Sequence, residues 1–261
     1  LKLSKDDFVK IIKRCKKKKI KFLSSPFDIN SIKLLKKLRI KTFKIPSGEI
    51  NNVPYLEYIG SLKRNIILST GMSDLVEVKN AINILVRNGM KKKNISILHC
   101  STEYPANIKK LNLMSIRYLK DKLKLNVGYS DHSIGYEASL ISLALGAKIF
   151  EKHFTLNKFA KGPDHKASLS PKELINYIKK LNDFKKSIGR YQKKPYKEEL
   201  RIAKIARKQI VALSKIKPGD KFSVKNITTK RARQGIPASQ WNKILGKYSK
   251  FYFTEDQNIK V

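Results

Sequence analysis

Six short apolar stretches in this chain each end in a cluster of polar residues. With their polar ends they read KFLSSPFD (21–28), FKIPSGE (43–49), ILSTGM (67–72), ILHCSTEYP (97–105), VGYSDH (127–132) and FEKHFTL (150–156). This pattern is typical of a (β/α) barrel, in which buried parallel strands run into loops that carry the chemistry at their carboxyl ends. Because those ends meet at one mouth of the barrel, the sequence predicts an enzyme site there.

Helical patterns separate the apolar stretches. Strands are expected near 21–25, 41–46, 65–70, 95–100, 125–130 and 148–153, and helices near 5–19, 30–38, 74–88, 110–123, 136–145 and 171–189. This alternation predicts an α/β protein with a parallel sheet. Ser4, Ser73 and Ser170 precede helix starts as expected caps. A (β/α)8 TIM barrel needs eight strands and only six can be placed, so we expect a barrel that lacks its first two strands.

The composition and pattern of the sequence change after Gly189. The stretch RYQKKPYKEEL is polar, and short β-like runs broken by Pro-Gly turns follow it. We therefore expect an incomplete barrel domain at 1–189, a linker at 190–203 and a small β-rich domain at 204–261. The last is close to the lower size at which a domain can fold alone.

The chain is strongly basic, with 58 Lys and Arg against 20 Asp and Glu and a net charge of +38. Such a balance is typical of nucleic-acid binding. Lysine greatly outnumbers arginine, however, and no basic motif is interleaved with aromatic residues of the kind that stack on bases. We therefore expect solvated lysine-rich faces and no nucleic-acid partner, with a positive field that draws anionic substrates.

Membrane and disulfide signals are weak. No apolar run is long enough to cross a bilayer, so no membrane partner is expected. Cys15 and Cys100 are far apart in the sequence and give no support for a disulfide framework. A cytoplasmic location is the default for such a chain.

Two histidines follow neighbouring predicted strands. His132 and His153 could place their imidazoles close enough to share one divalent metal ion. Two ligands leave several positions open for water and substrate oxygens, which fits a Lewis-acid metal better than a closed structural zinc site. The alternative is a pair of hydrogen-bonded core histidines. The occurrence of both at strand ends favours the metal.

Hydroxyl and charged residues stand at the other strand ends. Lys44 could hold a phosphate or carboxylate, Ser47 could donate to the same anion, and Glu49 could bind or shuttle a proton. A capped loop with a surface ion pair is the alternative for this segment. The remaining hydroxyls suit recognition of a small, oxygen-rich anion, and they are Ser25, Ser69, Thr102 and Ser130.

Three further residues are candidates for substrate contact. Tyr104 lies in a loop and could form a wall of the site. Glu151 lies two residues before His153, so strand alternation puts both on one face, where Glu151 could meet substrate or pair with a lysine. Asp164 lies in the run GPDHK, which could cover the mouth or form a polar turn. Cys100 closes an apolar run and is expected to be a buried thiol.

Seven segments in order resemble the N-acetylneuraminate (sialic acid) synthase family, including its legionaminate-type branch. They are FLSSPFD, KIPSGEI, LSTGM, HCSTEYP, VGYSDHS, EKHFTL and GPDHKASL. The tail, with ARKQIVA, KPGD, KRARQGI and WNKILGK, resembles that family's C-terminal antifreeze-like (SAF) domain. The resemblance implies a transferase that condenses phosphoenolpyruvate with an N-acetylmannosamine-type sugar to give a nonulosonic (sialic-type) acid and phosphate. A diacetamido-trideoxy sugar, as for an N,N'-diacetyllegionaminate synthase, stays open as the acceptor.

The resemblance also implies roles for single residues. His132 and His153 match catalytic metal ligands, for manganese or magnesium. Positions that line the phosphoenolpyruvate pocket match Ser25, Lys44, Ser47, Glu49, Ser69, Thr102 and Ser130, with Glu49 catalytic. Tyr104, Glu151 and Asp164 match residues that hold the sugar. Arg231 matches an arginine that a partner subunit inserts over the mouth, which implies a homodimer with exchanged C-terminal domains.

The family's first two strands carry a glutamate and a phosphate-binding lysine that have no counterpart here. We therefore expect residues 1–261 alone to be inactive. Two other functions stay open. A non-catalytic basic module for nucleic acid or another polyanion would show a steep salt dependence and no metal dependence. A related phosphoenolpyruvate-dependent synthase for another sugar is also possible, although the appended small domain argues against it.

Overall fold

The computed structural model describes residues 3–261, which form two compact units. The first unit ends at Gly189 and the second spans Arg190–Val261. The α-helices of the first unit are α1 (Lys5–Lys17), α2 (Ile29–Lys37), α3 (Val53–Ser61), α4 (Leu75–Arg87), α5 (Met114–Leu123), α6 (Glu137–Ala144) and α7 (Pro171–Ile188). Its strands are β1 (Thr42–Ile45), β2 (Asn65–Ser69), β3 (Ile95–Cys100), β4 (Asn126–Asp131) and β5 (Phe150–Lys152). Short 3-10 turns are η1 (Ser47–Glu49), η2 (Lys92–Asn94) and η3 (Ile108–Lys110).

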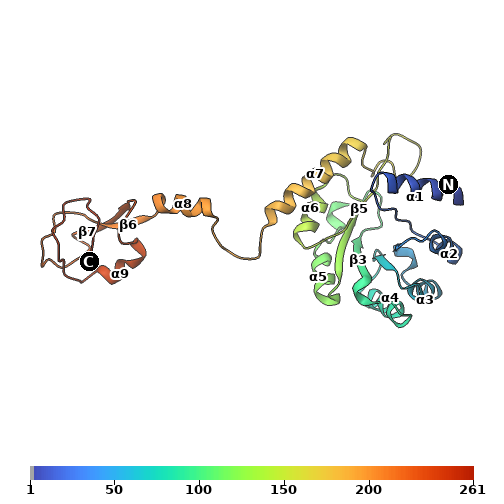
Figure 1. Ribbon diagram of the computed structural model, residues 1–261, viewed down its shortest axis with the longest axis horizontal. Helices are drawn as coiled ribbons and strands as arrows, with labels where there is room; N and C mark the ends of the chain where they lie inside the picture. Colours follow the sequence, from blue (N-terminus) through green and yellow to red (C-terminus); the bar gives the residue numbers. More distant parts are fainter. Residues whose placement is uncertain (1–2) are drawn as a thin grey trace. The chain divides into compact units, whose positions relative to one another are not determined.

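The five strands form one parallel sheet in the order β1-β2-β3-β4-β5. The sheet curls so far that Lys44 of β1 and Glu151 of β5 form an ion pair of 3.1 Å, although three strands separate them in the sheet. The helices lie around the outside of this curl (Figure 1). The first unit is therefore a half-barrel, and the predicted α/β class and parallel sheet are confirmed.

The core fills the space between the sheet and the helices. On α4 the buried residues Val78, Ala81, Ile82 and Leu85 recur at the three- and four-residue spacing of one helix face. They pack in the same cluster as outward-facing strand residues such as Phe43, which is fully buried. Each fully buried large apolar side chain contributes on the order of 1.5–3 kcal/mol. This packing fixes the strands whose ends carry the polar residues.

The predicted caps are mostly confirmed. Ser4 and Ser170 each form a capping box at the start of α1 and α7. At α4 the cap is Asp74 and not Ser73, because the Ser73 hydroxyl donates to the Gly71 carbonyl in the preceding turn. Helix α7 ends as predicted at Gly189, which has a positive φ of 64°.

The predicted strand at 21–25 is wrong. The segment 21–27 has no regular structure, and it reaches the sheet through one backbone hydrogen bond of 3.4 Å, from the Lys44 N–H to the Ser24 carbonyl. One bond does not make a ladder, so the described sheet has five strands where six were expected. The helix α3 was not predicted; Asn52 caps it and Pro54 lies in its first turn.

The second unit is small and built around one antiparallel pair. It contains α8 (Lys197–Ala206), β6 (Lys208–Ala212), β7 (Ile227–Arg231), η4 (Ala238–Gln240) and α9 (Trp241–Ile244). Strands β6 and β7 pair antiparallel. Their apolar residues share a core with distant segments, through residues such as Phe222 and Phe253. The stretch 190–203, predicted as a linker, includes most of α8. Within residues 3–261 no helix is long and apolar enough to cross a membrane.

Candidate active site

Charged and polar side chains from three strands meet at the carboxyl end of the half-barrel. One carboxylate oxygen of Glu151, at the end of β5, accepts hydrogen bonds from Ser130 Oγ of β4 at 2.7 Å and from Lys44 Nζ of β1 at 3.1 Å. Lys44 and Ser130 are both buried. Charge-assisted bonds of this kind are short and hold their groups in fixed positions. Of the two interpretations of Glu151, the pairing with a lysine is therefore observed.

His132 follows β4 and is also buried. Its Nδ1 lies 2.5 Å from the Ser101 carbonyl, which can only accept, so Nδ1 carries the proton. The other nitrogen, Nε2, lies 3.3 Å from Ser130 Oγ and keeps its lone pair. Burial lowers the pKa of His132, against the opposing effect of the Ser101 bond. A neutral imidazole whose second nitrogen is fixed by a carbonyl has the arrangement that metal-binding histidines use.

His153 and Tyr104 lie next to His132. The imidazole centroids of His132 and His153 are 5.3 Å apart, and the Tyr104 ring is 4.1 Å from the first and 5.4 Å from the second. Asp164, in the loop after β5, places Oδ2 3.9 Å from His153 Nδ1. The structure thus brings the two predicted metal ligands together with the three predicted sugar contacts of the first unit, Glu151, Tyr104 and Asp164.

The donor set of this cluster fits an open metal site. Two imidazoles lie edge to face, at an interplanar angle of 81°, and among the described residues no group of three or more His, Cys, Asp or Glu side chains is arranged to hold an ion. A closed structural zinc site, which needs four protein ligands, is therefore not built here. A Lewis-acid ion needs such open positions for water and substrate oxygens.

A second group of predicted residues surrounds Gly71, at the turn after β2. The Gly71 N–H donates to Ser47 Oγ at 3.0 Å, and that hydroxyl lies 3.4 Å from Cys100 Sγ. A Cβ at position 71 would lie 2.7 Å from Thr102 Cγ2 and 2.9 Å from Ser47 Oγ. A side chain at position 71 would force Ser47 or Thr102 to shift, so the glycine allows both to lie close to this turn. Cys100 is a buried free thiol, as predicted.

The remaining predicted residues are Glu49, Ser69 and Ser25 of the first unit and Arg231 of the second. Glu49 lies on η1 and accepts a hydrogen bond of 2.6 Å from Asn52, as in the capped-loop alternative. Ser69 is buried at the end of β2, and Ser25 is half-buried in the irregular segment. Arg231 ends β7 in the second unit and is exposed.

Three residues that the sequence analysis did not single out support this cluster. Ser101 fixes His132 through its carbonyl, and Asp131 and Lys152 form a buried ion pair on the outer face of the same strands. Burial lowers the pKa of Lys152, and Asp131 opposes that shift. The available signal was a charged residue directly before each histidine, Asp131 before His132 and Lys152 before His153.

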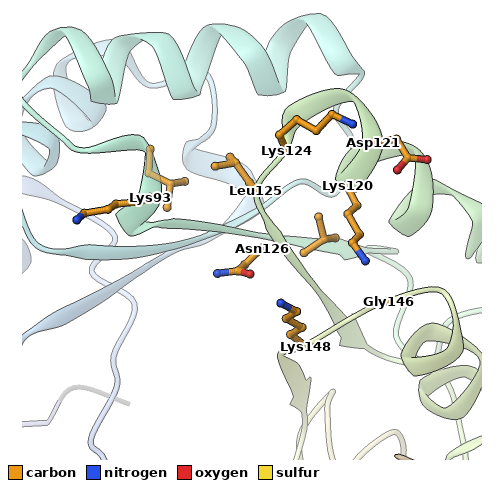
Figure 2. Close-up of a pocket in the computed structure, with 10 residues that line it drawn as sticks. Lys93, Lys120, Asp121, Lys124, Leu125, Asn126, Gly146 and Lys148 are labelled. Carbon is orange, nitrogen blue, oxygen red and sulfur yellow. The ribbon is translucent and has the colours of Figure 1, made fainter. Parts of the chain in front are cut away.

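A cavity of about 440 Å³ lies at the opposite, amino end of the strands. Figure 2 shows Lys120 and Lys148 pointing toward its middle and Lys93 pointing away. Lys124 and one carboxylate, Asp121, also line it. The lysines are exposed, and none of the predicted site residues line this cavity.

Comparison with known proteins gives the family. Residues 1–193 match the NeuB family. The chain is 49% identical over 250 residues to the N,N'-diacetyllegionaminic acid synthase of Campylobacter jejuni subsp. jejuni serotype O:2, a match that covers 96% of this chain and 75% of that protein. This chain belongs to the NeuB family. The family predicted from the seven segments is therefore confirmed.

Two further relatives of this NeuB-family chain agree. It is 37% identical over 248 residues to the N,N'-diacetyllegionaminic acid synthase of Legionella pneumophila, covering 94% of this chain and 70% of that protein. In structure it is similar to the N-acetylneuraminic acid (sialic acid) synthetase of Leptospira borgpetersenii serovar Hardjo-bovis, with a TM-score of 0.72 and 33% identity. That match covers 77% of this chain and 71% of the solved one.

Proposed function

We propose that this chain is a nonulosonic-acid synthase, which condenses phosphoenolpyruvate with an N-acylated amino sugar and releases phosphate. Membership of the NeuB family and its synthase relatives support this activity. The observation that carries the proposal is the cluster at the carboxyl end, where His132, His153 and Lys44 meet around Glu151 and Ser130. A non-catalytic basic module gives no reason for such a buried polar cluster.

In this proposal the chain's own residues bind and orient two substrates. His132 and His153 would hold a divalent metal ion, Mn²⁺ or Mg²⁺, which when bound supplies Lewis-acid polarisation of the sugar aldehyde. Lys44 would leave Glu151 to neutralise the phosphate or carboxylate of phosphoenolpyruvate. The hydroxyls of Ser47 and Ser130 would donate to the same substrate.

The hydroxyls and acids at the other strand ends complete the two subsites. Ser25, Ser69 and Thr102 would line the phosphoenolpyruvate pocket, and Glu49 would bind or shuttle a proton there. Tyr104, Glu151 and Asp164 would hold the sugar. The contacts of Tyr104 and Asp164 with the imidazoles, and the bond between Glu151 and Ser130, support this division.

The reaction balances with these groups. The methylene carbon (C3) of phosphoenolpyruvate forms a bond with the aldehyde carbon, and the aldehyde oxygen takes up a proton. Water adds to C2, the carbon that bears the phosphate and the carboxylate, and loses a proton. Inorganic phosphate then leaves from the resulting tetrahedral intermediate. The positive field of the chain draws both anionic groups toward the mouth.

For the acceptor, we propose the diacetamido-trideoxy sugar of the legionaminate-type branch. The 49% identity to the Campylobacter enzyme exceeds the 33% identity to the Leptospira sialic acid synthetase. N-acetylmannosamine is the second candidate. Discrimination between them depends on hydrogen bonds to hydroxyl or acetamido groups. A pocket built to bond such a group strongly rejects a sugar that lacks it.

We also propose that the curled sheet is part of an eight-stranded barrel, and that residues 204–261 are an antiparallel-paired SAF domain. Arg231 of that domain would reach the mouth of a partner subunit in a homodimer with exchanged C-terminal domains. Its exposed position at the end of β7 supports this role. The enzyme would act in the cytoplasm.

The test follows phosphate release from phosphoenolpyruvate with Mn²⁺ and either acceptor sugar. It compares the protein with its His132→Ala variant. Release with the diacetamido sugar, lost in His132→Ala, supports the proposal. Release with N-acetylmannosamine instead moves the acceptor to the second candidate. No release by the protein with either sugar contradicts the proposed activity.

A further inference from the structure

The outer face of β4 and β5 carries a buried ion pair next to the two histidines. Asp131 is fully buried and the Lys152 side chain is 4% exposed, with Nζ 3.1 Å from Oδ2. The two residues lie opposite each other in the last register pair of the β4–β5 ladder. Each is followed directly by a histidine, His132 after Asp131 and His153 after Lys152. The pair therefore lies at the point where the backbone ladder stops and the histidines begin.

Side-chain hydrogen bonds continue where the ladder ends. Asp131 Oδ1 accepts from the N–H of Ser133 at 2.9 Å and from its hydroxyl at 2.6 Å. Lys152 Nζ donates to the carbonyl of the same Ser133. Because Asp131 and Ser133 flank His132, these bonds fix the backbone on both sides of that residue. The bond from Lys152 to the Ser133 carbonyl also connects this backbone to the residue that precedes His153.

Two helices complete the network from outside the sheet. Ser139 of α6 donates to Asp131 Oδ2 at 2.6 Å, and its hydroxyl lies 2.7 Å from the hydroxyl of Tyr177 in α7. The carboxylate of Asp131 thus has a partner on each oxygen. A buried polar network whose members are all bonded is rigid.

Stability alone gives no reason for this arrangement. Replacing a buried ion pair by well-packed apolar residues is often neutral or stabilising. The outer face of the same strands is otherwise apolar or aromatic, as at Val127, Tyr129 and Phe150. The charges occur at the one level of the sheet where the next residue on both strands is a histidine.

We propose that Asp131 and Lys152 are positioning residues that hold the imidazoles of His132 and His153 at the separation needed to share one divalent metal ion. This inference rests on the proposed function, which gives the two histidines that ion. The pair acts through the backbone, since it lies on the opposite face of the strands from the imidazoles.

The test measures Mn²⁺ binding and thermal unfolding, neither of which requires turnover. Free Mn²⁺ is counted by electron paramagnetic resonance during titration of the parent, Asp131→Asn, Lys152→Met and the double variant. Leu85→Ala is the matched control, because Leu85 is fully buried in α4 of the same unit and takes no part in the hydrogen bonds of Asp131 and Lys152. His132→Ala and His153→Ala define loss of the site.

Each single variant is expected to weaken Mn²⁺ binding about 10- to 100-fold, the range for groups that orient metal ligands. The double variant has no unpaired charge and regains thermal stability, but its Mn²⁺ affinity stays low. Leu85→Ala loses stability and keeps its affinity. Ser139→Ala removes one hydrogen bond and no charge, so it should give a smaller loss of Mn²⁺ affinity. It replaces any charge variant that fails to fold.

Either of two results would overturn the inference, and the two have different consequences for the proposed function. Parent-like Mn²⁺ affinity in the double variant, with the histidine variants still deficient, means that the pair is only structural and leaves the proposed function intact. Mn²⁺ binding that survives in both histidine variants removes the metal site itself, and with it both proposals.

Discussion

The two ends of the parallel sheet present opposite kinds of polar surface. At the carboxyl end Lys44, Glu151, Ser130 and His132 are bonded to one another, and three of the four are buried. At the amino end the lysines around the 440 Å³ cavity are exposed, and none of them forms an ion pair among the described residues. Both ends are rich in charged residues, but among the described residues the charged groups are fixed by hydrogen bonds and ion pairs at the carboxyl end and not around the amino-end cavity.

The difference separates a functional site from a compositional trend. Exposed lysines cost little to place and follow from a chain with a net charge of +38. Buried charges are expensive unless each is paired and hydrogen-bonded. The network at the carboxyl end requires specific partners from β1, β4 and β5, whereas the amino end requires none. Substitutions at the two ends should therefore have unequal effects.

The largest effect is expected from removal of one imidazole. His132→Ala should lower the rate of phosphate release by about a thousandfold or more, because the proposed metal ion loses one of its two protein ligands. Steady-state kinetics with both substrates measure this. Lys148→Ala at the amino end is the control and should stay within twofold of the parent. An equal fall in the rate of phosphate release in the two variants would contradict the claim that only the carboxyl end is functional.

A smaller loss is expected when the carboxylate of Glu151 is neutralised. Glu151→Gln keeps the shape but removes the negative charge with which Glu151 would accept a hydrogen bond from the sugar. Hydrogen bonds to charged groups contribute about 1.5–3 kcal/mol, which corresponds to a fall of about 10- to 100-fold in kcat/KM. The split between kcat and KM for each substrate shows which one Glu151 meets. An unchanged value for both substrates would exclude Glu151 from the site.

The loop after β5 at the carboxyl end should respond to acid. The backbone N–H of Ser170 and the ammonium of Lys158 lower the pKa of Glu173 from 4.5 to about 2. A lowered pKa contributes stability that is complete above about pH 4.5 and is lost as the pH falls toward 2. The contribution is modest because the ion pair is largely exposed. Unfolding free energies of the parent and Glu173→Gln should converge across this interval, and parallel curves would contradict the assignment.

The smallest effect is expected at the amino end. Lys120 and Lys148 face the same cavity without an ion pair, so Lys120→Ala with Lys148→Ala should change the unfolding free energy by less than about 0.5 kcal/mol. Urea unfolding measures this. A loss of more than about 2 kcal/mol would show that these lysines have partners of the kind found at the carboxyl end.

The sequence alone was enough to predict what depends on local periodicity and strand order. The strands at 41–46 and 95–100 were predicted because short apolar runs end in polar clusters. His132 and His153 were expected to meet because parallel strands that follow each other in sequence are neighbours. The 5.3 Å between their rings agrees with that expectation.

The rest depends on tertiary geometry that no local pattern records. The Lys44–Glu151 pair joins the two edge strands of the sheet and exists only because the sheet curls. Helix α3 was not predicted, and its packing depends on a tertiary contact. Gly60 allows a close approach to α4, because a Cβ at that position would lie 3.0 Å from the Leu85 carbonyl oxygen. The apolar run at 21–25 has strand composition but forms one backbone bond to β1.

The most direct test of the account uses crystals of the protein soaked with Mn²⁺ and phosphoenolpyruvate. The structure is determined and the anomalous diffraction of manganese is recorded. The account predicts one strong peak about 2.0–2.2 Å from an imidazole nitrogen of both His132 and His153, with the phosphate near Lys44. A peak that lies elsewhere, or phosphoenolpyruvate bound among the lysines of the amino-end cavity, would contradict it.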